Sequence, residues 1–461
     1  MSGLQAVIVS RIRPSRRQHD REMVAHKQRK SNQVGSWWLV VSGRKTTNYQ
    51  PLTTQPGGIH VASGDFMRIT DHQKRALTYG AVGAGILLAA QAWRRRNPHD
   101  FAGKSVVITG GSRGLGLVLA RELADQGARL TLVARDEDEL QRAVEDLETR
   151  QPFAEVLPAP ADVRIRHQAE RAIAMAFERF GAVDVLINNA GIIQVGPIDH
   201  MKLADYEDAM LTHFWGPLYM TVAALPHMRR EGAGRIVNIS SIGGKISVPH
   251  LVPYSASKFA LAGLSEGLRS ELARYNITVT TVFPGLMRTG SPVNAMFKGQ
   301  RPQEYAWFAI SDSLPISSIT PERAARQIIR ACRYGDAELI ITIQAKMAVL
   351  ARTVAPELFA DTMALINQLL PGPSMSDGDE PRPGRENESK LAGPPSPLTA
   401  PTYRAAEENN EMIVRAIARV ERVADQPLDR FPRCSRPSAS SLPQVTSMPA
   451  SAPKSRPSRS G

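Results

Sequence analysis

The chain has 461 residues, of which 42% are hydrophobic and 22% are charged. This composition is typical of a folded soluble protein, and it excludes a wholly disordered chain and a multi-span transporter. With two cysteines, Cys332 and Cys434, the chain lacks both a disulfide framework and a cysteine-based zinc site, so no metal site is predicted. The net charge of +13 suits nucleic acid, an anionic membrane or merely basic tails.

The excess charge lies outside the part of the chain that is patterned as strands and helices. Residues 1–66 carry net +7, residues 67–100 net +4 and residues 372–461 net +2, whereas residues 101–371 hold 28 basic and 28 acidic side chains. We therefore expect no nucleic-acid binding by the folded part, because such binding needs a basic surface. Residues 1–66 are interpreted as a disordered basic arm or a targeting segment, and the interpretation we favour is that translation begins at Met67.

Residues 67–100 contain an apolar stretch, Ala76–Trp93, with 18 residues and no formal charge. As a helix it would reach about 27 Å, near the lower end for a membrane span. Three arginines follow it, which would place the next domain in the cytoplasm. We predict a membrane-anchor helix. The alternative is a buried or surface-docked helix, since polar and small residues dilute the stretch at Gly80, Gly83, Gly85 and Gln91.

Residues 101–371 alternate short apolar strands with helical patterns. Strands are predicted over 105–109, 129–134, 156–163, 183–188, 235–240, 277–283 and 338–342. Helices are predicted over 114–126, 136–150, 165–180, 206–230, 254–275 and from 321 onward. Strands that are apolar on both faces indicate a parallel sheet covered on both sides. The fold class is therefore α/β, a Rossmann-type doubly wound, seven-stranded parallel sheet with helices on both faces.

The first strand runs into a glycine-rich turn that opens a helix. Its residues suit a dinucleotide pyrophosphate, because the backbone can approach closely and the helix presents free N–H groups. The predicted phosphate-binding residues are Thr109, Gly110, Ser112, Arg113, Gly114, Leu115 and Gly116.

Two arginines bear on the choice of cofactor. The second strand ends at Arg135, where NAD enzymes usually place an acid, and Arg113 lies in the glycine-rich turn. Guanidinium groups suit a 2′-phosphate, so NADP(H) is favoured over NAD(H). Asp136 argues the other way, and either arginine alone would also be explained as a solvated side chain.

Tyr254 and Lys258 are four residues apart and share one helix face. A nearby ammonium lowers the pKa of a phenol, so Tyr254 can serve as a general acid toward a carbonyl or a base toward an alcohol. Ser241 lies 13 residues upstream of Tyr254, at the end of a strand, where its hydroxyl can bind the reacting oxygen.

In this order and spacing the motifs over Phe101–Pro371 resemble those of the classical short-chain dehydrogenase/reductase (SDR) superfamily. The resemblance implies an oxidoreductase acting on CH–OH groups, with Asp162 against adenine and Lys258 also at the nicotinamide ribose. It further implies that Asn188 and Ala190 line the adenosine side and that Pro284, Gly285 and Thr289 border the nicotinamide carboxamide. Val163 and Gly191 are also expected to contact the cofactor.

His213 departs from the superfamily pattern, which usually has Asn at this place. An imidazole donates and accepts hydrogen bonds, so we predict that His213 takes part in a proton relay to the catalytic lysine. The alternatives are a weakened relay, or a histidine that only binds backbone groups at a kink.

The region before the last predicted helix is rich in large apolar residues, which predict a lid over a hydrophobic substrate: Met296, Phe297, Tyr305, Trp307, Phe308 and Ile310. The alternative is that they form core or oligomer contacts. We also expect a homo-oligomer formed through the long helices. Residues 372–461 are predicted to be a mostly disordered Pro/Ser-rich tail with a helix near 406–424. The rival function is a non-catalytic nucleotide-binding scaffold.

Overall fold

The computed structural model describes residues 71–96, 98–313, 318–375, 378–387 and 399–412. The arm predicted over 1–66 and the tail beyond 412 lie outside these residues. The chain divides into two compact units, Met1–Thr78 and Tyr79–Gly461. Of the first unit only the start of helix α2 is described, so the architecture below is that of the second.

A helix does form where the apolar stretch was found, as α2 (Asp71–Arg96). Within the described ranges, however, no helix combines the length and the apolar character needed to cross a membrane. The prediction of a membrane-anchor helix over 76–93 is therefore not confirmed. Glycines and Gln91 interrupt the apolar residues of this helix, which is the physical reason that it falls short.

Seven parallel strands form the central sheet, in the order β11-β7-β6-β4-β1-β2-β3. Their bounds are β1 Ser105–Thr109, β2 Arg129–Ala134, β3 Val156–Pro160, β4 Val185–Asn188, β6 Gly234–Ile239, β7 Ile277–Phe283 and β11 Glu338–Ile340. The order runs in opposite directions from β1, toward β2 on one side and β4 on the other. This confirms the predicted doubly wound fold and makes the crevice beside β1 the expected ligand site.

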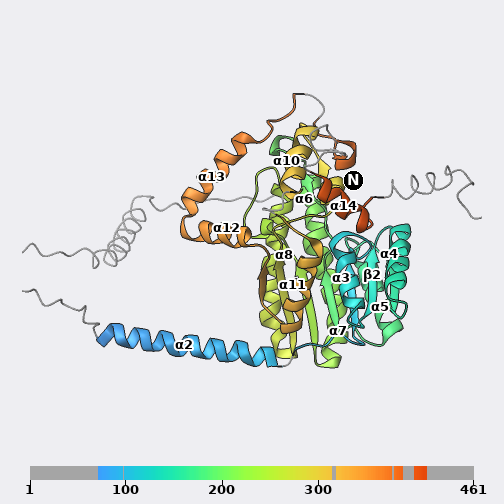
Figure 1. The fold of residues 1–461 in the computed structure, drawn as a ribbon, viewed down its shortest axis with the longest axis vertical. Coiled ribbons are helices and arrows are strands. Elements are labelled where there is room, and N and C mark those ends of the chain that lie inside the picture. The colour runs from blue at the N-terminus through green and yellow to red at the C-terminus, as the bar shows by residue number, and fades with distance from the viewer. Residues whose placement is uncertain (1–70, 97, 314–317, 376–377, 388–398, 413–461) are drawn as a thin grey trace, which may run out of the picture. The chain divides into compact units, whose positions relative to one another are not determined.

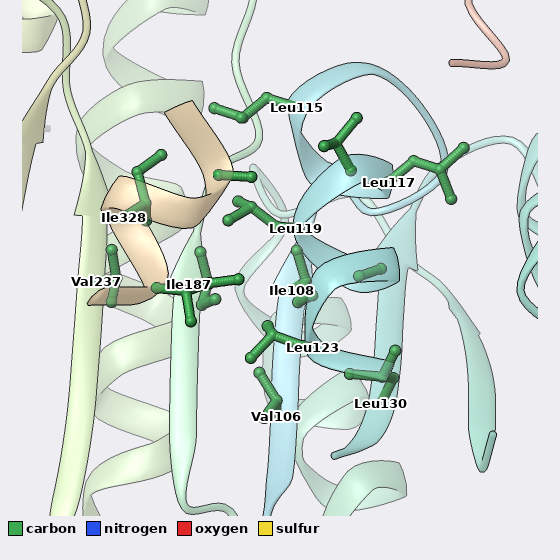
Figure 2. Close-up of a cluster of buried hydrophobic side chains, with 14 of the residues drawn as sticks. Val106, Ile108, Leu115, Leu117, Leu119, Leu123, Leu130, Ile187, Val237 and Ile328 are labelled. Carbon is green, nitrogen blue, oxygen red and sulfur yellow. The ribbon is translucent and has the colours of Figure 1, made fainter. Parts of the chain in front are cut away.

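Helices cover both faces of the sheet (Figure 1). One face carries α3 (Gly114–Ala124), α4 (Glu137–Arg150) and α11 (Pro321–Tyr334), and the other carries α5 (Arg166–Phe180), α7 (Gly216–Glu231) and α8 (Val252–Leu272). Figure 2 shows the hydrophobic core between the sheet and the first of these two helix layers. Ile108 of β1 lies beside Leu119 and Leu123 of α3. Ile187 of β4 and Ile328 of α11 belong to the same core. Burial of these apolar surfaces fixes α3, and with it the turn that precedes it.

The single helix predicted over 206–230 is divided. Helix α6 (Leu203–Met210) is followed by one π-helical turn over Leu211–Trp215 and then by α7. Pro217 lacks an N–H group, so regular hydrogen bonding cannot run through this point. The break places His213 inside the irregular turn, a kind of distortion that is frequent at functional sites.

Part of the apolar region that was predicted to form a lid belongs to a hydrophobic core cluster. Phe297 of β9 (Met296–Phe297) and Tyr305 of α10 (Arg301–Ser313) are fully buried and pack together, with Val195 of β5 (Gln194–Val195) in the same cluster. The core alternative therefore holds for these two aromatic residues. Two residues from the same region, Trp307 and Phe308, reach the cavity described below.

The last described elements follow β11. Helices α12 (Ile343–Val354) and α13 (Pro356–Leu369) pack on each other, and β12 (Arg382–Pro383) pairs with β9. Helix α14 (Ala400–Glu408) lies earlier in the chain than the helix predicted near 406–424, most of which falls outside the described residues.

Candidate active site

A cavity of about 1080 Å³ lies at the carboxyl ends of the central strands. Its wall contains the turn after β1, the residues that follow β4 and β6, and the loop after β7. All four predicted catalytic residues line it, as do the predicted cofactor residues other than Thr109, Gly116 and Asn188. The fold therefore brings together predicted residues that lie far apart in the sequence, from Gly110 to Thr289.

Thr109 and Gly116 do not line the cavity, but their contacts determine the conformation of the glycine-rich turn. The Thr109 hydroxyl accepts hydrogen bonds from the N–H groups of Asn189 and Ala190, at 2.9 and 3.0 Å. A β-carbon at Gly116 would come within 1.9 Å of the carbonyl oxygen of Gly110, so only glycine fits there. Gly114 has a positive φ of 56° and opens toward the cavity. The turn is thus held in a form that directs the start of α3 toward the cavity, where a helix N-terminus can receive an anion.

Asn188 has a different place from the one that the resemblance implies. Its side chain is buried and donates a hydrogen bond to the Asn238 side chain at 2.8 Å, between β4 and β6. The neighbouring Asn189 lines the cavity instead and binds the carbonyl oxygens of Thr109 and Gly110. In the Asn-Asn-Ala-Gly run the first amide therefore ties strands together, and the second holds the glycine-rich turn.

The two arginines on the cofactor side differ in their partners. Arg113 forms an ion pair with Glu139 of α4 at 2.8 Å, and Ser112 donates a hydrogen bond to the same carboxylate. Arg135 is exposed on the cavity wall. Asp136, the residue that argued for NAD(H), caps α4 by accepting a hydrogen bond from Glu139 N–H at 2.8 Å. Its side chain therefore has a structural role.

Asp162 follows β3 and is held by Arg164. Two guanidinium nitrogens of Arg164, Nε and Nη2, and its backbone N–H donate hydrogen bonds to the Asp162 carboxylate, the shortest at 2.7 Å. Burial raises the pKa of Asp162, but these hydrogen bonds outweigh it and the pKa lies below its usual value. The carboxylate stays ionised and fixed at the cavity edge.

Ser241, Tyr254 and Lys258 converge from two elements. Ser241 follows β6, and its hydroxyl accepts a hydrogen bond from Gly243 N–H at 3.1 Å. Tyr254 and Lys258 lie one turn apart on α8, with the ammonium 5.6 Å from the centre of the phenol ring. Burial raises the pKa of Tyr254, while its hydrogen bond with Ser241 acts in the opposite direction.

Lys258 is buried and donates a hydrogen bond to the carbonyl oxygen of Ile239 at 2.9 Å. Burial lowers the pKa of its ammonium to about 7. The site thus holds a protonated phenol beside a lysine that is only partly protonated near neutral pH. A pair of groups with pKa values moved in opposite directions is the usual sign of an acid–base centre.

His213 is fully buried and both of its ring nitrogens are engaged. Nε2 accepts a hydrogen bond from Ile192 N–H at 3.1 Å, so the proton lies on Nδ1, which donates to the Ser257 hydroxyl at 2.7 Å. That hydroxyl donates in turn to the carbonyl oxygen of Tyr254. Burial and the charge of Lys258 hold the pKa of His213 well below its usual value. This geometry matches the backbone-binding alternative, because neither nitrogen is left to pass a proton.

Two cavity residues carried no sequence signal. Asp312 of α10 is buried and accepts a hydrogen bond from Met287 N–H at 3.2 Å, while its other carboxyl oxygen has no hydrogen-bond partner among the described residues. Burial holds its pKa well above the usual value. Glu411 reaches the cavity from beyond α14. Each lies far along the chain from the motifs that it joins, so neither is apparent before folding.

The chain has relatives in several organisms. It is 35% identical over 264 residues to Dehydrogenase/reductase SDR family member 7B of Xenopus laevis, covering 56% of this chain and 80% of that protein. It is 37% identical over 262 residues to Putative oxidoreductase SadH of Mycobacterium tuberculosis, covering 55% and 91%. It is 36% identical over 242 residues to 3-ketodihydrosphingosine reductase of Mus musculus, covering 52% and 71%.

Among solved structures, a short-chain dehydrogenase from Streptomyces avermitilis is similar with a TM-score of 0.49 and 28% identity, covering 59% of this chain and 98% of that one. The family profile described as short chain dehydrogenase matches residues 104–297, from the first strand through β9. With this match and relatives aligned over most of their own length, the chain belongs to the short-chain dehydrogenase/reductase family of oxidoreductases.

Proposed function

We propose that the protein is an NADP(H)-dependent oxidoreductase that interconverts a carbonyl and an alcohol on a lipophilic small molecule. The observation that carries the proposal is the convergence of Ser241, Tyr254 and Lys258 on the cavity that the glycine-rich turn also lines. A hydroxyl, a phenol and an ammonium at one point provide what a carbonyl oxygen needs to gain a proton.

The roles of the three residues follow from their surroundings. Ser241 holds the reacting oxygen by a hydrogen bond. Tyr254 is a phenol whose pKa burial raises further, so it is protonated at neutral pH and gives its proton to that oxygen in the reductive direction. Lys258 stabilises the phenolate that remains, since its ammonium lies against the same ring. The nicotinamide, when bound, exchanges a hydride with the substrate carbon.

The residues present fit a phosphorylated dinucleotide. Gly114 and the start of α3 offer backbone N–H groups and a helix N-terminus to the pyrophosphate. Arg135, exposed on the same wall, and Arg113 supply guanidinium groups for a 2′-phosphate. The resemblance adds Asp162 near adenine and Pro284, Gly285 and Thr289 near the carboxamide, and all four line the cavity.

The substrate end of the cavity is apolar. Its wall includes Val248, Leu251, Trp307 and Phe308. Such a lining favours a hydrophobic substrate. The name of one relative, 3-ketodihydrosphingosine reductase, indicates a ketone substrate for that protein. We extend only the chemical class, a lipophilic ketone or the matching alcohol, to this chain, and we expect a homo-oligomer and no nucleic-acid partner.

A panel of lipophilic ketones and alcohols, followed by the absorbance of NADPH, tests the proposal. We expect NADPH-dependent turnover of at least one member and much less with NADH. Tight NADPH binding without turnover across the panel would favour the rival, a nucleotide-binding scaffold. Failure to bind either nicotinamide cofactor would overturn the proposed function.

A further inference from the structure

A segment near the end of the described chain lies across the glycine-rich turn. We call residues 399–412 the C-terminal strap; it consists of α14 and the four residues that follow it. Its helix is anchored on α10, where the Tyr403 and Tyr305 hydroxyls are 2.5 Å apart and the Thr402 and Ser313 hydroxyls 2.7 Å apart. Helices α14 and α10 lie at the same end of the domain in Figure 1. The anchor delivers the residues after α14 to the cavity.

The residues after α14 bind the start of α3 by main-chain and side-chain contacts. Gly114 N–H donates a hydrogen bond to the carbonyl oxygen of Asn409 at 2.9 Å. Arg121, farther along α3, donates to the Asn409 side chain at 2.7 Å. A free N–H group at a helix N-terminus is the feature that makes the glycine-rich turn suitable for a phosphate. In this structure the N–H group of Gly114 is already hydrogen-bonded to the strap.

Asn410 extends the contact of the strap to Ser112 and Glu139 on the cavity wall. Its side-chain amide donates hydrogen bonds to the carbonyl oxygens of Ser112 and Glu139, at 2.9 and 3.1 Å, and accepts one from Arg142 at 3.0 Å. Its φ of 58° is left-handed, a conformation that asparagine tolerates better than most residues. The turn at this residue directs Glu411 into the cavity.

Glu411 places a carboxyl group between the two cofactor-facing loops. One oxygen accepts a hydrogen bond from Gly290 N–H at 2.5 Å, directly after Thr289. A β-carbon at Gly114 would come within 2.9 Å of the other oxygen, so the carboxyl group fills the space that the glycine leaves open. Asn294 also holds the carbonyl oxygen of Glu411, at 3.3 Å.

A carboxylate and a phosphate use the same kind of site, since both are anions that accept hydrogen bonds from helix N-termini and loop amides. Burial raises the pKa of Glu411 to about 7, and in either protonation state its carboxyl group fills the space beside Gly114 that a phosphate would need. We propose that the C-terminal strap is an autoinhibitory element, in which Glu411 occupies the place of a cofactor phosphate and must leave before the dinucleotide binds. This inference rests on the proposed function, because it names the regulation of that same site.

The test compares NADPH binding by the full chain in three forms: wild type, Glu411→Ala and Glu408→Ala. Glu408 is the matched control, because its side chain is exposed on the strap and its hydrogen bond to Arg121 uses the backbone oxygen. We expect Glu411→Ala to tighten NADPH binding by about 5-fold or more, the scale of one hydrogen bond. Glu408→Ala should bind as the wild type does. In the wild type, saturating NADPH should raise the amide hydrogen exchange of residues 399–412.

Two results would overturn the autoinhibitory role of the strap alone. Equal NADPH affinity in all three forms would show that Glu411 does not compete, and the proposed function would stand. Reduced exchange of residues 399–412 with NADPH bound would show that the segment closes over the cofactor instead. Absence of NADPH binding in every form, with unfolding curves that show folded protein, would overturn the proposed function and the strap together.

Discussion

Lys258 of α8 donates a hydrogen bond to the carbonyl oxygen of Ile239, the last residue of β6, at 2.9 Å. This contact ties the helix that carries Tyr254 to the strand that delivers Ser241. It also keeps an ammonium in a buried place, where its pKa falls to about 7. The free-energy cost of charging this lysine is therefore part of the stability of the fold.

The cost of charging Lys258 makes the free energy of unfolding depend on pH. The pKa of Lys258 is about 7 in the folded protein against an ordinary value of 10.5, so between these pH values the unfolded chain binds more protons at this residue. The penalty is fully present below pH 7 and is relieved as the pH rises toward 10.5. We expect the free energy of unfolding of the wild type, relative to Lys258→Met, to rise with a slope approaching about 1.4 kcal/mol per pH unit in this window.

Chemical denaturation at several pH values measures this difference. Lys346→Met is the control, because Lys346 is exposed on α12, and its difference from the wild type should stay flat with pH. A flat difference for Lys258→Met as well would contradict a lysine that is buried with a lowered pKa.

His213 should act on stability and leave the proton chemistry alone. His213→Ala removes the acceptor for Ile192 N–H and the partner of Ser257 and leaves a buried void, so we expect a loss of about 2–4 kcal/mol in the free energy of unfolding. The exposed His167 of α5, changed to Ala, should cost little. Because both nitrogens of His213 are engaged, the shape of the pH–rate profile should be retained. A profile whose limbs move in His213→Ala, but not in His167→Ala, would restore the relay hypothesis.

The fold and the reacting residues were predictable because their signals are local. Apolar runs mark the strands of the sheet, the glycine-rich turn follows the first of them, and Tyr254 and Lys258 lie within one helical turn. Asn188 was assigned to the cofactor side, yet it bonds to Asn238 inside the sheet. A one-residue difference along the chain decides whether a side chain faces the cavity or the core, and no local pattern records it.

What escaped prediction depends on contacts between distant segments. Asp312 enters the cavity from α10, and Glu411 enters it from a stretch for which the sequence predicts a helix near 406–424 and no role in the site. The fully buried Tyr305 was read as part of a lid, because its burial depends partly on Tyr403, 98 residues away. Tertiary packing, and not propensity, determines the role of each of these residues.

Arg135 should control the choice of cofactor. Arg135→Asp replaces a guanidinium on the cavity wall with a carboxylate, which repels a 2′-phosphate and accepts hydrogen bonds from a ribose hydroxyl. We expect the ratio of kcat/KM for NADPH to that for NADH to fall by about 10-fold or more. The same charge change at the exposed Arg171 of α5, which is not part of the cavity wall, should leave the ratio as it is. An unchanged ratio in Arg135→Asp would remove the basis for preferring NADP(H).

Tyr254→Phe tests the central claim most directly, measured as kcat on a substrate identified with the wild type and as NADPH affinity on the same preparations. The change removes the phenol hydroxyl and keeps the ring against His213 and Lys258. Loss of a general acid should lower kcat by about 100-fold or more, while NADPH affinity stays within about 3-fold of the wild type. Tyr275→Phe, outside the cavity, is the control and should retain full turnover. Turnover near the wild-type rate in Tyr254→Phe would contradict the proposed chemistry.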